Sequence, residues 1–325
     1  DELQSVVESL GFRCSRGTYT DKWCVNGLHT CDSITQMQNK HQYLYNGQRT
    51  DPSSIPNGFD SRAFLYADGF FESMLVVNNT IPLFDLHYGR ISASLSAYKI
   101  TPKENLSASV LREHLLSLAN STGLSKCARI RLTVFRSNQG GGKYTPASNE
   151  ADWVAHIERN EHVGFKLNEK GIAISIFEDL KKNPSEFSML KNIDAQIYIQ
   201  AAIYAQEKNI GDVLILNTDD NIIEATSSNV FLVSGGELYT PKLSSGPVGG
   251  VMRATVINIA ISLGIKVFEC NLTPQELLKA DEVFLTNAVE GIKWVSSYRT
   301  KRYFNKTAAK LLDALNASIS ETSVL

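Results

Sequence analysis

The sequence predicts a mixed α/β protein with two domains. Short strand patterns alternate with helical patterns between about residues 42 and 157, and a second series begins near residue 171. The chain has 325 residues, of which 43% are hydrophobic, so it can bury a substantial core without disulfides. We expect an N-terminal extension at 1–41, a smaller α/β domain at 42–158, an interdomain linker at 159–170 and a larger domain at 171–325.

The extension has little hydrophobic periodicity. A short helix fits Leu3 to Leu10, and the polar remainder carries Cys14, Cys24, His29 and Cys31. Their spacing lacks the C-x2-C knuckle of zinc sites and no second half follows, so we predict no metal site. The sequence leaves the role of the extension open.

The first predicted domain opens with a hairpin, because the Asn46-Gly47 pair favours a tight turn between short strands. The following elements come from apolar alternation and from helical periodicity. They are strand Ser73–Val77, turn Asn78-Asn79, strand Ile81–Phe84, helices Leu86–Tyr98 and Glu104–Ala119, and strands Ala128–Phe135 and Asp152–Ile157. The loop from Gly140 to Tyr144 separates the last two strands and is suited to closing over a pocket.

The second predicted domain also combines helices with short strands. We expect Asp194 to cap a helix that runs through Glu207 and that Gly211 ends. The turn-forming cluster at 218–221 separates two strands of a hairpin. The expected strands are Ile172–Ile176, Val213–Asn217, Ile222–Glu224, Val230–Val233 and Leu238–Thr240. A second helix is expected after Gly250, running through Ala254 to Leu263.

Charge and hydropathy exclude several classes of function. The 32 Lys and Arg residues oppose 34 Asp and Glu residues without a long run of one sign, so nothing predicts binding to nucleic acid or to an anionic membrane. There is no apolar run of about 18 residues, and the N-terminus lacks the pattern of a signal peptide. We expect a cytoplasmic protein whose partners are small molecules.

Three segments carry the chemistry that one cofactor requires. Pyridoxal 5′-phosphate needs an amine for its aldehyde, a carboxylate for its ring nitrogen and an anion site for its phosphate. Lys191, Glu224 and the glycine-dense segment Gly246–Arg253, which precedes a helix, supply these in order. Each alone is more often an ordinary surface lysine, strand carboxylate or loop. Their order, together with Arg90 and Thr286-Asn287-Ala288, favours the cofactor.

Seven segments extend this pattern to a family. They are Leu65–Ser73, His87–Ile91, Arg129–Val134, Ser188–Asp194, Glu224–Val230, Gly246–Arg253 and Asp281–Ala288. On these segments the chain, from about Tyr43 to Leu315, resembles the class IV aminotransferases, the pyridoxal phosphate enzymes of fold type IV. This family includes branched-chain aminotransferases, D-amino acid aminotransferases and aminodeoxychorismate lyases. The resemblance implies a two-domain α/β (α+β) architecture like that of D-amino acid aminotransferase, outside which the extension lies.

The resemblance also implies roles at matching positions. Lys191 matches the Schiff-base lysine that moves a proton, Glu224 the carboxylate at the ring nitrogen, and Arg90 the arginine that holds the phosphate. The other implied cofactor-binding positions are Ser228, Asn229, Val251, Met252, Thr286 and Asn287. The implied substrate-pocket positions are Phe71, Arg131, Tyr144 and Ala288. An exposed strand charge is an equally good interpretation of Arg131.

The resemblance implies an enzyme without fixing its reaction. Our first choice is an aminotransferase that moves the amino group of an L-amino acid, branched-chain-like, to a 2-oxo acid. The alternative is an aminodeoxychorismate lyase that releases 4-aminobenzoate and pyruvate. This alternative is favoured by two segments that are similar to lyase signatures, Thr286-Asn287-Ala288 and Arg136–Tyr144. A non-catalytic protein that binds pyridoxal phosphate is a remote third, since Lys191, Glu224 and Arg90 are all present. Family members pair as homodimers, so we expect a homodimer.

Overall fold

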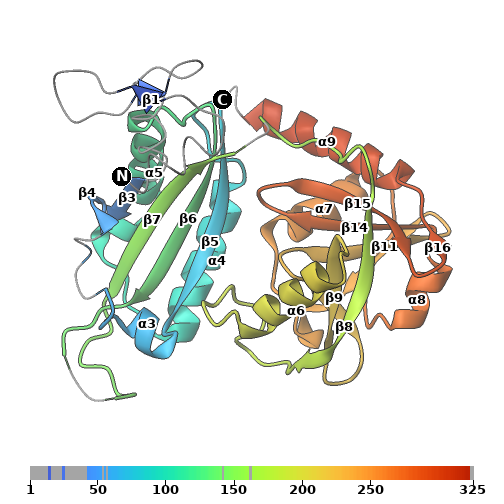
Figure 1. Cartoon of the computed structure of the whole chain (residues 1–325), viewed down its shortest axis with the longest axis horizontal. Helices are drawn as coiled ribbons and strands as arrows, with labels where there is room; N and C mark the ends of the chain where they lie inside the picture. Colours follow the sequence, from blue (N-terminus) through green and yellow to red (C-terminus); the bar gives the residue numbers. More distant parts are fainter. Residues whose placement is uncertain are drawn as a thin grey trace.

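The computed structural model describes residues 14–15, 24–25, 42–52, 55, 58–140, 143–160 and 163–322. Two β-sheets, each with helices packed against it, dominate these residues (Figure 1). The expected helix at Leu3–Leu10, and His29 and Cys31, lie outside the described residues. Within them, the N-terminal extension contributes only the paired strands β1 (Cys14–Ser15) and β2 (Cys24–Val25).

The first sheet is antiparallel, with five strands in the order β4-β3-β7-β6-β5 among the described residues. Apolar side chains of its strands meet α4 and α5 in one buried cluster that includes Met74, Ile91, Leu115 and Trp153. The elements of this part are β3 (Gln42–Tyr45), β4 (Gln48–Thr50), α3 (Arg62–Tyr66), β5 (Gly69–Val77), α4 (Phe84–Tyr98), the 3-10 helix η2 (Glu104–Leu106), α5 (Ala108–Ser121), β6 (Cys127–Arg136) and β7 (Ala151–Arg159).

The structure confirms the hairpin turn and corrects two elements of this part. Asn46 and Gly47 have φ of 49° and 85°, the left-handed values that a tight hairpin turn needs. The strand expected at Ile81–Phe84 is wrong: Leu83 turns the chain at a φ of 59°, and α4 begins at Phe84. The single helix expected at Glu104–Ala119 is also wrong, because Ser107 is extended and its carbonyl accepts from the Leu111 amide, which starts a new helix.

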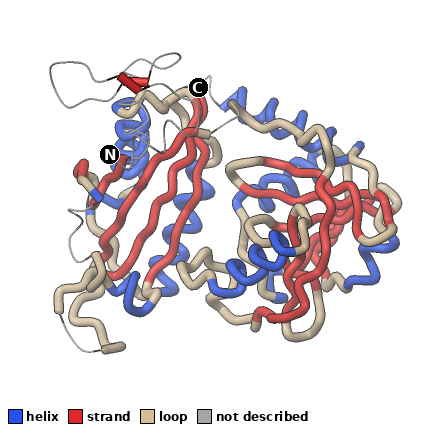
Figure 2. Tube along the Cα trace, viewed as in Figure 1, coloured by secondary structure: helices blue, strands red, loops and turns tan. Residues whose placement is uncertain are grey.

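The second sheet is mixed, and its main path runs β10-β9-β8-β15-β14-β11-β12-β13 among the described residues, with β16 on β15. Helix α6 packs on β8 and β9, whereas α7 and α9 pack near β14 and β15 (Figures 1 and 2). The elements are β8 (Ile172–Lys182), α6 (Gln196–Glu207), β9 (Asp212–Asn217), β10 (Ile222–Ala225), β11 (Asn229–Ser234), β12 (Glu237–Pro241), η3 (Leu243–Ser245), α7 (Val251–Ser262), β13 (Val267–Cys270), α8 (Pro274–Lys279), β14 (Glu282–Asn287), β15 (Gly291–Tyr298), β16 (Lys301–Arg302) and α9 (Lys306–Thr322).

The ends of α6 differ from the expectation. The N-cap residue is Ala195, not Asp194, whose carboxylate instead accepts from the Gln196 amide at 3.5 Å. The helix ends at Glu207 as expected, but Gly211 does not end it: Asn209, at a φ of 52°, turns the chain first. Asparagine tolerates the left-handed region that usually selects glycine, and this tolerance explains the shift.

Backbone hydrogen bonds join the two sheets at the segment around Lys191. The Phe71 amide on β5 donates to the Lys191 carbonyl at 2.8 Å, and the Ile193 amide donates to the Gly69 carbonyl at 3.2 Å. Gly69 leaves no room for a side chain here, since an added Cβ would lie 2.5 Å from the Val134 carbonyl oxygen. The lysine segment is thereby fixed against the edge of the first sheet. Across the part of the chain that the structure describes, no helix combines the length and apolar character that crossing a bilayer requires.

Candidate active site

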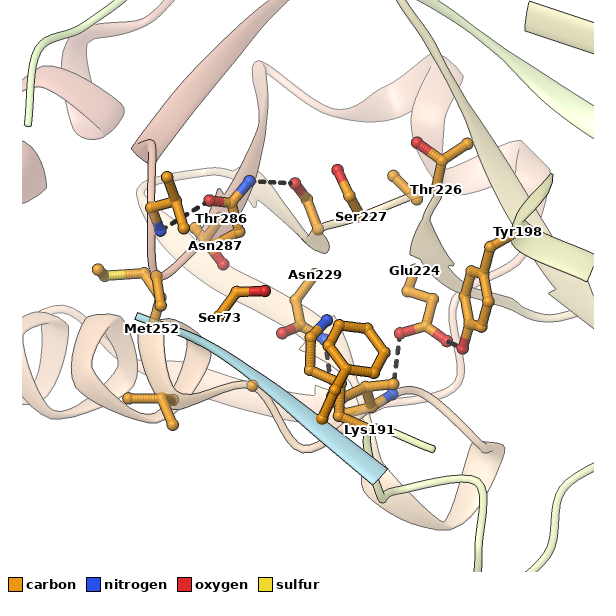
Figure 3. Close-up of a pocket in the computed structure, with 18 of the residues that line it drawn as sticks. Ser73, Lys191, Tyr198, Glu224, Thr226, Ser227, Asn229, Met252, Thr286 and Asn287 are labelled. Carbon is orange, nitrogen blue, oxygen red and sulfur yellow. Dashed lines mark hydrogen bonds between the residues drawn. The ribbon is translucent and has the colours of Figure 1, made fainter. Parts of the chain in front are cut away.

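A pocket of about 440 Å³ lies at this junction. Strands β5 and β6 and helix α4 line one side, and the Lys191 segment, β10, the loop before β11, the start of α7 and the end of β14 line the other. Twelve of the thirteen site residues that the sequence predicted line it: Phe71, Arg90, Arg131, Lys191, Glu224, Ser228, Asn229, Val251, Met252, Thr286, Asn287 and Ala288. Figure 3 shows how those that it labels surround the cavity.

Tyr144 is the one predicted residue that does not line the pocket. Its side chain is 82% exposed, and its ring packs edge-on against Tyr66 with the centroids 5.8 Å apart. The Arg62 guanidinium donates to the Tyr144 carbonyl and lies over the Tyr66 ring. Within a single chain, Tyr144 therefore belongs to an exposed aromatic surface and not to the pocket.

Lys191 provides the amine of the site. Its Nζ lies 4.6 Å from the centroid of the Phe71 ring. Burial and the nearby Arg90 guanidinium lower the pKa of Lys191 from its ordinary value of 10.5 to about 8. A much larger fraction of this amine is therefore neutral near pH 7 than in an ordinary lysine, as a nucleophilic amine requires.

Glu224 provides a buried carboxylate on β10. One oxygen, Oε1, accepts from the Tyr198 hydroxyl and from Lys182 Nζ, each at 2.8 Å, and Oε2 accepts from the Val248 amide at 2.8 Å. Figure 3 shows Glu224 and Tyr198 facing each other at one side of the cavity. These three donors fix the orientation of the carboxylate. Sequence reasoning missed both side-chain partners.

The start of α7 provides an anion site. The first amides of a helix have no acceptor within the helix, and Gly250 offers no side-chain cap to those of Val251 and Met252. A Cβ on Gly250 would lie 1.8 Å from Asn229 Oδ1, so any larger residue at this position would displace the Asn229 side chain. The hydroxyl of Thr286 is buried at the pocket wall and has no hydrogen-bond partner among the described residues. An anion at this place would satisfy polar groups that have no partner within the described part of the chain.

Arg90 adds a positive charge to this end of the pocket. Its Nε and Nη2 donate to the two oxygens of Glu72 at 2.6 and 2.7 Å, and its Nη1 donates to the Gly249 carbonyl at 2.9 Å. His87 Nδ1 lies 2.7 Å from Glu72 Oε2. Burial alone would raise the pKa of Glu72, but Arg90 and His87 outweigh it and lower that pKa to about 2. Glu72 is therefore ionised and holds the guanidinium in place, a role that the sequence analysis did not assign.

Two further arginines of the pocket lie on β6. Arg131 and Arg129 are two residues apart and line the same pocket, with the Arg131 guanidinium 3.7 Å from the Phe71 ring centroid. Arg129 Nη1 donates to Glu158, whereas its Nε is buried without a partner in the described ranges. Burial, and secondarily Arg129, lower the pKa of Arg131. Both arginines are cations that a substrate carboxylate can neutralise. Of these two arginines, only Arg131 was predicted from the sequence.

The turn after β14 closes the remaining wall. Asn287 Oδ1 accepts from the amides of Val289 and Glu290, and its Nδ2 donates to Ser228 Oγ at 3.1 Å (Figure 3). The Asn287 side chain thus ties the turn that carries Ala288 to the loop before β11. Ala288 leaves space at this wall, because its side chain is a single methyl group.

The cavity combines an amine of lowered pKa, a buried carboxylate and a helix start without a side-chain cap, and this combination is typical of an enzyme active site. The profile of the family described as amino-transferase class IV matches residues 69–298. The chain belongs to the class IV aminotransferases and is an enzyme of this family, whose members depend on pyridoxal phosphate.

Relatives within the family have different activities. An aminodeoxychorismate lyase from Vibrio harveyi is 27% identical over 254 residues, which are 74% of this chain and 86% of that protein. A mitochondrial branched-chain-amino-acid aminotransferase from Arabidopsis thaliana is 37% identical over 113 residues, but these cover only 34% of this chain and 29% of that protein. The chain is thus similar to both kinds of enzyme.

Solved structures establish the fold. The branched-chain amino acid aminotransferase from Escherichia coli superposes with a TM-score of 0.76 at 21% identity, over 86% of this chain and 94% of that one. The 4-amino-4-deoxychorismate lyase from Pseudomonas aeruginosa gives a TM-score of 0.72 at 24% identity, over 85% and 98% of the two chains. These likenesses confirm the predicted α/β fold of type IV pyridoxal phosphate enzymes.

Proposed function

We propose that the protein binds pyridoxal 5′-phosphate and transfers the amino group of an L-amino acid, branched-chain-like, to a 2-oxo acid through a Schiff base at Lys191. The observation that carries the proposal is the convergence of Lys191, Glu224 and the α7 anion site on one pocket. The Thr286 hydroxyl, which has no partner among the residues that the structure describes, the uncapped helix start and Arg90 fit a phosphate. Glu224 faces the same cavity and fits the ring nitrogen.

Each residue has a distinct task in this proposal. The neutral amine of Lys191 holds the cofactor aldehyde and afterwards carries a proton to and from the substrate α-carbon. Glu224 keeps a proton on the ring nitrogen, and Arg90 with the α7 amides holds the phosphate. When bound, the cofactor supplies a sink for the electron pair left at the α-carbon. Arg131 holds the α-carboxylate of the substrate.

The pocket composition supports an amino acid with an aliphatic side chain. Phe71, Leu190, Ala288 and Val289 line the cavity and provide apolar contact, while Arg131 provides the charge for a carboxylate. Apolar walls with a small number of polar anchors are usual for small-molecule sites.

A lyase is the second candidate, because the alignment with the Vibrio harveyi lyase covers 86% of that protein. To separate the two, purified protein loaded with pyridoxal phosphate is mixed with L-leucine and 2-oxoglutarate, and separately with aminodeoxychorismate. An aminotransferase forms L-glutamate and the 2-oxo acid of leucine, whereas a lyase forms 4-aminobenzoate and pyruvate. The Lys191→Ala variant is the control and forms neither pair of products. If wild-type protein forms no product from either mixture, the proposal is wrong.

We also propose that the enzyme is a homodimer. Large apolar side chains are exposed next to one another around α3, with Phe59 81%, Phe64 67%, Leu65 50% and Tyr144 82% exposed. Contiguous apolar surface of this kind marks interaction sites. A second copy of the chain would cover this surface, which accounts for the position of Tyr144 outside its own pocket.

A further inference from the structure

Lys182 is a partly buried cation that lies behind the pocket and is not part of its lining. It is the last residue of β8 and lies after an irregularity in the pairing of β8 with β9. Its side chain is 12% exposed. Its Nζ donates to three acceptors, the Ser188 carbonyl at 3.1 Å, the Tyr198 hydroxyl at 2.7 Å and Glu224 Oε1 at 2.8 Å. Every donor position of this ammonium is therefore used.

The three side chains form a closed network. Tyr198 accepts from Lys182 and donates to the same Glu224 oxygen at 2.8 Å. Glu224 is thus in an ion pair with a group that a ligand in the pocket does not touch. A carboxylate that is already paired with one cation stabilises a proton on another neighbouring group less than an unpaired carboxylate does. The reason is that both positive charges interact with the same negative charge and repel each other.

We propose that Lys182 is a positioning residue that weakens the hold of Glu224 on the proton of the cofactor ring nitrogen and so tunes the acidity of that nitrogen. The inference rests on the proposed function, in which Glu224 faces the ring nitrogen. Lys182 acts through Glu224 in two ways: it fixes the carboxylate orientation together with Tyr198, and its charge lowers the proton affinity of the pair formed by the carboxylate and the ring nitrogen.

The chain contains a matched control in the neighbouring residue. Lys181 also forms an ion pair, with Asp220 at 2.5 Å, but its side chain is 38% exposed and that of Asp220 is 67% exposed. Removing the charge of Lys181 changes the net charge of the protein by the same amount as removing that of Lys182. Because water screens the charge of Lys181, only Lys182 acts on Glu224.

The test is a pH titration of the ring nitrogen itself. Each variant is loaded with ¹⁵N-labelled pyridoxal phosphate, and the chemical shift of the ring nitrogen is followed by NMR. We expect Lys182→Met to raise the midpoint by about one pH unit or more, a tenfold gain in proton affinity. Lys181→Met should leave the midpoint unchanged, and Lys182→Arg, which keeps the charge, should restore it to near the wild-type value. A Lys182→Met midpoint equal to or below that of wild type overturns the proposal.

A second variant separates the charge of Lys182 from its hydrogen bonds. Lys182→Gln removes the charge but keeps hydrogen-bond donors, so a merely structural role of Lys182 would leave the midpoint in place, whereas our proposal expects the same rise. Circular dichroism and thermal unfolding establish that each variant is folded. If Glu224→Gln does not move the ring-nitrogen resonance, the cofactor placement in the proposed function fails. If Glu224→Gln moves it but Lys182→Gln does not, only the inference about Lys182 fails.

Discussion

The buried amine of Lys191 should destabilise the cofactor-free protein. The pKa of Lys191 falls from 10.5 to about 8 because folding removes the ammonium from water and places it near Arg90. The folded state therefore binds fewer protons than the unfolded state between these two pKa values, and the free energy of unfolding rises with pH in that window. Below about pH 8 the folded protein carries the full cost of the buried charge.

The magnitude follows from the same two values. At about 1.36 kcal/mol per pKa unit, the change corresponds to about 3 kcal/mol of unfolding free energy lost at pH 7. Lys191→Met removes the charge and keeps the length of the side chain. We expect the free energy of unfolding of this variant to exceed that of wild type by about 3 kcal/mol at pH 7, and by only about 1.4 kcal/mol at about pH 9.5.

Urea unfolding of the cofactor-free proteins at these two pH values measures the effect. Any gain from the apolar methionine itself is the same at both pH values, so the difference between them isolates the charge. Lys310→Met, which replaces an exposed lysine on α9, is the control and should show no such difference. Our reasoning is refuted if the advantage of Lys191→Met does not decrease from pH 7 to pH 9.5.

Three further predictions concern other parts of the protein. Arg90→Ala leaves the Glu72 carboxylate buried without its cation, so chemical denaturation should show a loss of roughly 3–5 kcal/mol; adding Glu72→Gln should recover stability but not cofactor affinity. Gly250→Ala places a Cβ 1.8 Å from Asn229 Oδ1, and absorbance titration should show cofactor affinity reduced at least about tenfold; unchanged affinity would place the phosphate elsewhere. Phe64→Ser, which removes a 67% exposed ring, should shift light-scattering mass toward the monomer, and an unchanged dimer contradicts the proposed interface.

Local sequence signals predicted the elements whose chemistry is local. The Asn46-Gly47 turn was predicted correctly because its left-handed backbone depends on those two residue types. The division at Ser107 and the missing strand at Ile81–Phe84 were not predicted, because apolar periodicity continues through both places. In each case the direction of the chain depends on how α4 and α5 pack against the sheet, and hydrophobic periodicity carries no information on this packing. The proposed domain boundaries rest on the sequence alone.

Residues that would touch the cofactor were more predictable than those that support them. Lys191, Glu224 and Arg90 lie in recognisable segments, and the structure brings all three to one pocket. Lys182 was not predicted, since it precedes Glu224 by 42 positions and looks like one of two ordinary adjacent lysines. Glu72 was inside a recognised segment, yet only its contact with Arg90 shows what it does. Supporting residues act through contacts between distant segments, which no single segment of the sequence reveals.

The charges of the pocket couple its anion sites to its amine. Arg90 and Arg131 each lower the pKa of Lys191, whereas Glu72 and Glu224 raise it. An anion bound beside either arginine cancels part of that positive field, so it must raise the proton affinity of Lys191; by linkage, protonated Lys191 favours anion binding. In the proposed function, the Lys191 amine would therefore be most nucleophilic before anions bind, and each bound anion would favour its protonated form. The arginines, which hold anions in the proposed function, therefore also contribute through their charge to the lowered pKa of Lys191.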